Sequence, residues 1–148
     1  MQNLAHDYVH EPKPTILLVE DFDDTRLMMK LWLQRNGYHV IEAETGEEAI
    51  TIARRELPDL IIMDVMMPGM NGLDATQQIR QYQPLKQIPI VAVSAYGADE
   101  YRELALEAGC NEYVSTPFNP RELAELIGDL LESRRLAGAD VRSSDLEY

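Results

Sequence analysis

A five-fold alternation of short apolar runs with amphipathic segments of helical period constrains the fold of this chain more than any other feature. Such alternation is typical of a doubly wound α/β fold, in which helices cover both faces of a parallel sheet. The expected strands are 16–20, 39–43, 59–64, 88–94 and 112–115, and the expected helices are 24–35, 46–57, 72–81, 98–108 and 120–133. The second strand has the weakest apolar pattern and is expected at an edge. The third is apolar throughout and is expected at the centre, where both faces of a strand are buried.

Polar residues and glycines mark the ends of the expected helices. Thr45 and Glu48 have the spacing of a capping box, and Asn71 is also placed to cap a helix. Asn119 is followed by a proline at the first helical position, a common helix start. Gly109 is expected to end a helix in the left-handed conformation.

Three of the apolar runs end in side chains suited to chemistry. Glu20 and Asp21 follow the first run, Asp64 ends the third, and Ser94 ends the fourth. If these strands are parallel and adjacent, their carboxyl ends meet at one crevice, so the four side chains lie together. Three carboxylates and a hydroxyl indicate a hard divalent cation and a phosphoryl group. Asp23 and Asp24, by contrast, are expected to act as helix caps or solvated acids.

The length of 148 residues predicts one domain with a core of its own. We expect residues 1–14 to form a flexible extension, residues 15–133 to form the domain, and residues 134–148 to form a mobile tail, because both ends lack apolar periodicity.

The composition restricts the compartment and the class of partner. The formal net charge of -13 argues against direct binding to nucleic acid and to anionic membranes. No run is long enough for a signal peptide or a membrane span, and Cys110 is the single cysteine. We therefore predict a cytoplasmic protein without membrane insertion.

These residues, taken in order, resemble the receiver domain of bacterial two-component response regulators. The resemblance covers about residues 15–132 and rests on four features: the acidic pair after the first strand, Asp64 before Met-Pro-Gly-Met-Asn-Gly, Ser94 followed by alanine, and Pro117-Phe118 after the fifth strand. It implies a flavodoxin-like sheet with strand order 2-1-3-4-5. It also implies that the chain is a phosphoacceptor signalling domain and no enzyme beyond self-catalysed phosphotransfer and autodephosphorylation.

The resemblance assigns a role to each candidate residue. Asp64 would accept a phosphoryl group from a sensor histidine kinase or a phosphotransfer protein. Asp21, Asp64 and the backbone carbonyl of Met66 would hold Mg²⁺, with Glu20 bound directly or through water. The cation is required because a carboxylate that attacks a phosphoryl group must overcome repulsion between like charges.

The same resemblance implies a switch that changes the affinity for a downstream protein. Ser94 would donate to the phosphoryl group, and Tyr113 would rotate with it, although core packing is an equally good reading of Tyr113. The changed face would be that of the fourth helix, fifth strand and fifth helix, which also offers a surface for homodimers. The exposed part of the first helix, around Arg26, Lys30 and Gln34, is where the resemblance places kinase docking.

Thr116 is the main departure from the family pattern, because a lysine normally precedes the Pro-Phe pair. Threonine donates a hydrogen bond but carries no charge, so we expect slow phosphorylation or weak coupling to the switch. The resemblance also implies a cis peptide between Thr116 and Pro117. Met66 and Tyr96 are bulky and suggest slow autodephosphorylation, because they would shield an acyl phosphate from water.

Three other functions are compatible with parts of the sequence. Residues 21–25 match the Asp-x-Asp-x-Thr motif of haloacid-dehalogenase-like phosphatases, but no lysine follows Ser94. A flavodoxin would need small hydroxyl residues where this chain has acids. The serious rival is a pseudo-receiver that docks constitutively with little or no phosphorylation, which Thr116 favours and the set of clustered carboxylates disfavours. We expect a stand-alone receiver.

Overall fold

The structure is a computed structural model that describes residues 12–95 and 99–145, with the side chains of 139–145 left out of the description. Its described strands form one parallel sheet in the order β2-β1-β3-β4-β5, which confirms the predicted strand order. The elements in chain order are β1 (Thr15–Val19), α1 (Asp23–Arg35), β2 (His39–Ala43), α2 (Gly46–Glu56), β3 (Leu60–Asp64), α3 (Gly72–Gln81), the 3-10 turn η2 (Gln83–Leu85), β4 (Ile90–Ser94), α4 (Asp99–Ala108), β5 (Glu112–Ser115) and α5 (Pro120–Asp145).

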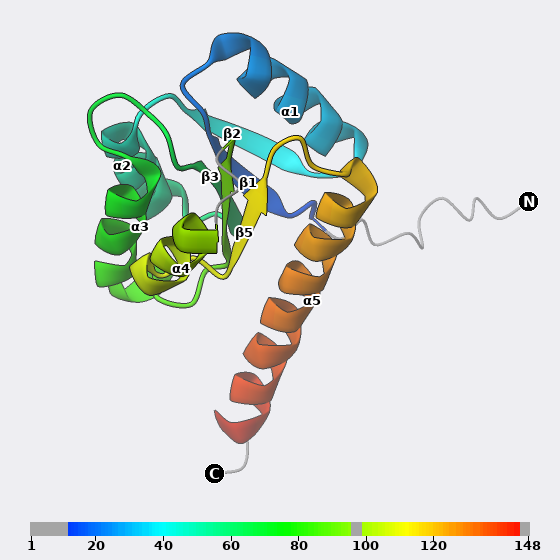
Figure 1. The fold of residues 1–148 in the computed structure, drawn as a ribbon. Coiled ribbons are helices and arrows are strands. Elements are labelled where there is room, and N and C mark those ends of the chain that lie inside the picture. The colour runs from blue at the N-terminus through cyan, green and yellow to red at the C-terminus, as the bar shows by residue number, and fades with distance from the viewer. Residues whose placement is uncertain (1–11, 96–98, 146–148) are drawn as a thin grey trace, which may run out of the picture.

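Alternate residues of each strand point into two separate cores. Leu17 and Val19 of β1 pack with α2, α3 and α4, whereas Ile16 and Leu18 pack with α1 and α5. Figure 1 shows the resulting layers, with α2, α3 and α4 on one face of the sheet and α1 and α5 on the other. The central strand β3 is buried along Leu60–Met63 and becomes half-buried at Asp64. The edge position of β2 and the central position of β3 agree with the sequence pattern.

The predicted caps are present in the structure. The Thr45 side chain accepts a hydrogen bond from the Glu48 N–H, and the Asn71 side chain accepts from the N–H groups of the second and third residues of α3. Asn119 accepts from the Arg121 N–H at 2.9 Å, and Gly109 has a φ of +113°. These local signals place the helix starts, and therefore the loops at the carboxyl edge of the sheet.

One boundary differs from the sequence expectation. The last helix, α5, continues to Asp145, although a tail was expected from residue 134. The backbone carbonyls of Pro58 and Asp59 accept hydrogen bonds from Nη1 of Arg134, at 3.2 and 2.6 Å. This long-range anchor supports the helix at the point where its apolar periodicity ends. Figure 1 shows α5 extending well beyond the sheet. Of the extension expected at residues 1–14, residues 1–11 lie outside the described residues, and residues 12–14 precede β1 without regular secondary structure.

Candidate functional site at the carboxyl edge of the sheet

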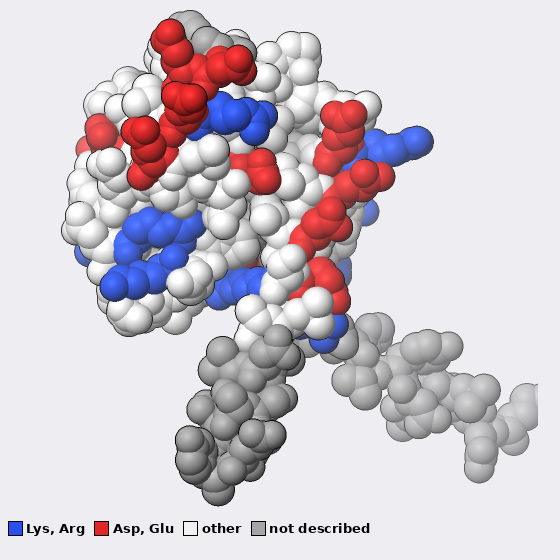
Figure 2. All heavy atoms as spheres, turned by 60° about the horizontal axis from the view of Figure 1, so that its bottom comes forward, with Lys and Arg blue, Asp and Glu red and all other residues white. Residues whose placement is uncertain are grey.

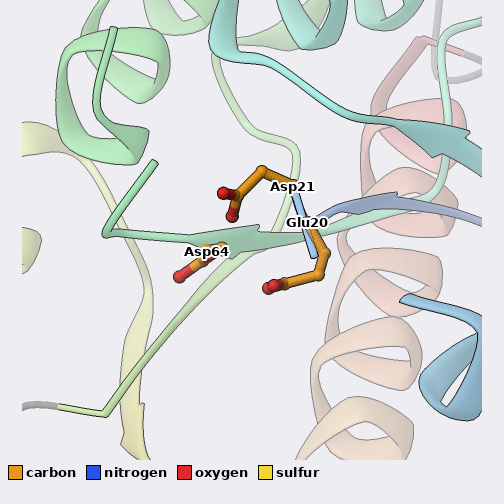
Figure 3. Close-up of side chains that lie close together, drawn as sticks. All are labelled: Glu20, Asp21 and Asp64. Atoms are coloured by element: carbon orange, nitrogen blue, oxygen red, sulfur yellow. The ribbon is translucent and has the colours of Figure 1, made fainter. Parts of the chain in front are cut away.

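Three carboxylates converge where β1 and β3 end. Glu20 and Asp21 immediately follow β1, and Asp64 is the last residue of β3, which lies beside β1 in the sheet. One oxygen from each side chain lies within 4.8 Å of the other two, and all three residues are half-buried. Figure 3 shows the carboxylates pointing toward one another. Each side chain reaches the cluster because its strand ends there, as the positions of the strand ends predicted.

The chain turns sharply after Asp64, and a glycine permits that turn. Val65 accepts a hydrogen bond from the Gly72 N–H at 3.0 Å, which brings the start of α3 against the end of β3. A Cβ atom at Gly72 would overlap the backbone carbonyl oxygen of Asp64. Asp64 Oδ1 accepts from the Met66 N–H at 3.2 Å, so the turn also orients the carboxylate.

Burial makes the cluster electrostatically costly. It raises the pKa of Asp64 from the ordinary 3.8 to about 8, and the hydrogen bond and repulsion from Glu20 act in the same direction. Burial also raises the pKa of Glu20. Carboxylates held this close and out of water favour a shared proton or a bound cation. The donor set consists of hard oxygens, which is the chemistry that Mg²⁺ prefers.

The remaining candidate residues lie on β4, β5 and the loop after β5. Ser94 ends β4 beside β3, is 2% exposed, and its carbonyl accepts from the Thr116 N–H at 2.8 Å. Thr116 is half-buried and is joined to Pro117 by a cis peptide, as the family resemblance implied. Tyr113 is buried on β5 within the core that faces α4. Met66 is 47% exposed, and Tyr96 lies outside the described residues.

Comparison with known proteins identifies the family. The family model described as "Response regulator receiver domain" matches residues 16–128, most of the chain. The chain belongs to the response regulator receiver family. Receiver domains are signalling domains and not classical enzymes; they accept phosphoryl groups, typically bind Mg²⁺ at an acidic pocket, and occur in proteins that interact with histidine kinases.

Three relatives illustrate the range of proteins that contain this receiver fold. The alkaline phosphatase synthesis transcriptional regulatory protein PhoP of Bacillus subtilis is 34% identical over 89% of this chain and 55% of its own length. An uncharacterized 14.6 kDa protein of Leptolyngbya boryana is 37% identical over 76% of this chain and 86% of its own length. A third similar protein is the receiver domain of a sensor histidine kinase from Pseudomonas aeruginosa PAO1, solved with magnesium coordinated in the active site cleft. It has a TM-score of 0.77 and 32% identity, and the match covers 82% of this chain and 99% of that one.

The structure corrects one expectation for α1, the exposure of Arg26, and agrees with another, the solvent exposure of Asp23. Arg26 was placed on the exposed, kinase-docking part of α1, but its side chain is only 11% exposed and lies against acids of α1 and β2. Asp23 of the phosphatase-like motif pairs with Arg26 at 2.6 Å and is not among the three clustered carboxylates. The burial of Arg26 could not be predicted from neighbouring residues, because it depends on how β2 packs beside α1. The described helices include none long and apolar enough to cross a membrane.

Proposed function

We propose that this receiver accepts a phosphoryl group on Asp64 from a sensor histidine kinase or a phosphotransfer protein. The carboxylate cluster carries the proposal, because three acids with oxygens within 4.8 Å of one another favour a bound cation and Asp64 lies at the end of a buried strand. Glu20, Asp21, Asp64 and the backbone carbonyl of Met66 would hold Mg²⁺, which would neutralise charge as the phosphoryl group arrives. A cytoplasmic location is supported by the single cysteine, Cys110, which cannot form a disulfide within the chain.

The hydroxyl groups of Ser94 and Thr116 would complete the pocket as hydrogen-bond donors. Their backbones are already joined, because the Thr116 N–H donates to the Ser94 carbonyl. A phosphoryl group that pulls on Ser94 would therefore also act on the loop after β5. Tyr113 is buried on β5, the strand that leads into this loop, and would transmit the change to the face of α4, β5 and α5.

Features of that face support a downstream protein as its partner. An open groove of about 410 Å³ lies there, and Tyr113, Phe118 and Leu126 are among its lining residues. The outer side of α5 exposes acids, and Figure 2 shows a row of acidic side chains along this helix. They are Glu122, Glu125, Asp129 and Glu132. A basic partner fits this surface better than a second copy of the chain, because like charges repel across an interface.

The first helix supports docking of the phosphoryl donor. Leu27, Met28 and Leu31 of α1 are 54%, 69% and 47% exposed, and Phe22 just before the helix is 60% exposed. Exposed apolar side chains grouped on one helix often mark a protein interface. The chain spans about half the length of several curated relatives, such as 55% of PhoP, and 86% of the length of the Leptolyngbya boryana protein.

Intact-protein mass after incubation with a small acyl phosphate tests the proposal. We expect a Mg²⁺-dependent gain of one phosphoryl group, lost in Asp64→Asn and kept in the control Asp74→Asn, which removes an exposed acid at the start of α3. No gain from this donor or from a panel of sensor kinases would favour the pseudo-receiver, the alternative suggested by Thr116 in place of lysine.

The rate of phosphorylation of a Thr116→Lys variant distinguishes a slow receiver from an inactive one. If the missing cation limits phosphorylation, Thr116→Lys should raise the rate of phosphoryl gain by about ten-fold or more, because it adds a charge-assisted donor at the phosphoryl group. Thr116→Val, which removes only the hydroxyl, should lower that rate. Equal rates in all three proteins would show that residue 116 does not act on the phosphoryl group.

A further inference from the structure

The Arg26 side chain lies beneath the turn that joins β1 to α1. Its Nη1 donates to the backbone carbonyl of Glu20 at 2.9 Å, and its Nη2 donates to Asp23 at 2.6 Å and to Glu44 at 3.0 Å. Its Nε lies 3.5 Å from a carboxylate oxygen of Glu42. All three guanidinium nitrogens are thus engaged, and the planar group is held in one orientation.

This contact fixes the backbone of the turn that carries Glu20 and Asp21. Both residues lie beyond the end of β1, where strand pairing no longer holds the chain. The Glu20 N–H still donates to the Ala43 carbonyl at 3.0 Å, and Arg26 supplies the partner for the Glu20 carbonyl. The Glu20 side chain in turn accepts from the Phe22 N–H at 3.2 Å, so backbone and carboxylate are linked in one turn.

The surrounding acids allow a cation to remain close to a cation-binding site. Three carboxylates, those of Asp23, Glu42 and Glu44, contact the guanidinium and offset its charge. Lys30, one turn further along α1, also pairs with Glu42, at 3.2 Å, but donates to no backbone group of the turn in the described contacts. Arg26 and Lys30 are therefore two cations on one helix, of which Arg26 hydrogen-bonds the turn that carries Glu20 and Asp21 and Lys30 contacts Glu42.

We propose that Arg26 is a positioning residue that sets the Mg²⁺ affinity of the receiver by holding Glu20 and Asp21 toward Asp64. This inference rests on the proposed metal site, but it does not require that phosphorylation occurs. Its sign is opposite to that of a simple charge effect. Removing a nearby positive charge should by itself strengthen binding of a cation, whereas loss of positioning should weaken it.

Calorimetric titration of the full chain with Mg²⁺, without any phosphoryl donor, tests the inference. Arg26→Met should weaken Mg²⁺ binding about ten-fold or more, the usual effect of losing a group that orients metal ligands. Arg26→Lys should also weaken it, because one ammonium cannot hold the Glu20 carbonyl and three acids together. The matched control Lys30→Met loses the same charge from α1 and should bind Mg²⁺ as tightly as the unmodified chain or slightly more tightly.

A second readout needs no metal. The carbonyl ¹³C resonance of Glu20 should shift in Arg26→Lys, because the hydrogen bond to that carbonyl is lost, and should stay in place in Lys30→Met. Unchanged or tighter Mg²⁺ binding in both folded Arg26 variants would overturn the proposal and leave Arg26 as an ion-pair residue only. If the unmodified chain binds Mg²⁺ but is never phosphorylated, the proposed function fails while the inference about Arg26 stands.

Discussion

At the scale of single residues, Asp64 combines partial burial with two neighbouring carboxylates. With a pKa raised from 3.8 to about 8, it is protonated in the folded chain and ionised in the unfolded chain over most of that interval. The folded state then binds more protons, so this group contributes stability that is present near pH 4 and is lost as the pH rises through 8.

Asp64→Asn should remove this pH dependence. In the absence of divalent ions, we expect the variant and the unmodified chain to have similar urea midpoints near pH 4 and the variant to be more stable at pH 8. The difference should be at least about 1 kcal/mol, and it stays below the value given by the full pKa difference because water screens the partly exposed carboxylate. Urea titrations at several pH values, with a chelator present, measure the difference. A constant difference between the two proteins across that range would contradict the raised pKa of Asp64.

Gly72 is the residue whose small size the site geometry requires most directly. Gly72→Ala places a methyl group on the carbonyl oxygen of Asp64, so α3 or the end of β3 must move, at a cost of about 1–3 kcal/mol. Gly128→Ala on α5 is the control, because no atom lies within 4 Å of its added Cβ and alanine favours a helix. Chemical denaturation should show a loss of stability for the first variant and no loss for the second.

At the scale of elements, the sequence pattern predicts those strand and helix positions that depend on neighbouring residues. The apolar run before Asp64 predicted β3, and Asn71 predicted the start of α3, because burial and capping follow from neighbouring residues. The contact of Arg26 with Glu44, just after β2, could not be predicted this way, since Glu44 lies 18 residues further along the chain. The length of α5 was missed for the same reason, because its anchor joins Arg134 to residues about 75 positions away.

That anchor gives a prediction for α5. Arg134→Ala should destabilise the part of the helix beyond residue 134, because few isolated helical turns are stable in water without tertiary contacts. Amide hydrogen exchange should therefore become faster for the amides after residue 134 and stay the same for those at 123–130. Arg135→Ala, which removes an exposed ion pair with Glu132, should leave both sets unchanged, because exposed ion pairs contribute little to stability. Equal exchange in both variants would mean that the Arg134 contacts do not stabilise the helix.

At the scale of the whole molecule, a net charge of -13 makes self-repulsion a general cost of folding. Any salt should therefore raise the melting temperature by screening, and Mg²⁺ should raise it further by binding the cluster of Glu20, Asp21 and Asp64. A ligand that binds only the folded state stabilises it by about 2.7 kcal/mol at 100 times its Kd.

The two contributions separate when MgCl₂ is compared with NaCl at equal ionic strength. We expect the melting temperature to be several degrees higher in MgCl₂, since 1 kcal/mol corresponds to roughly 2–4 °C in a domain of about this size. In Asp64→Asn the excess should disappear while the effect of NaCl remains, because screening acts on all the charges and coordination needs the site. An equal excess in the variant would place the Mg²⁺ effect on the general acidic surface and not at the end of β3.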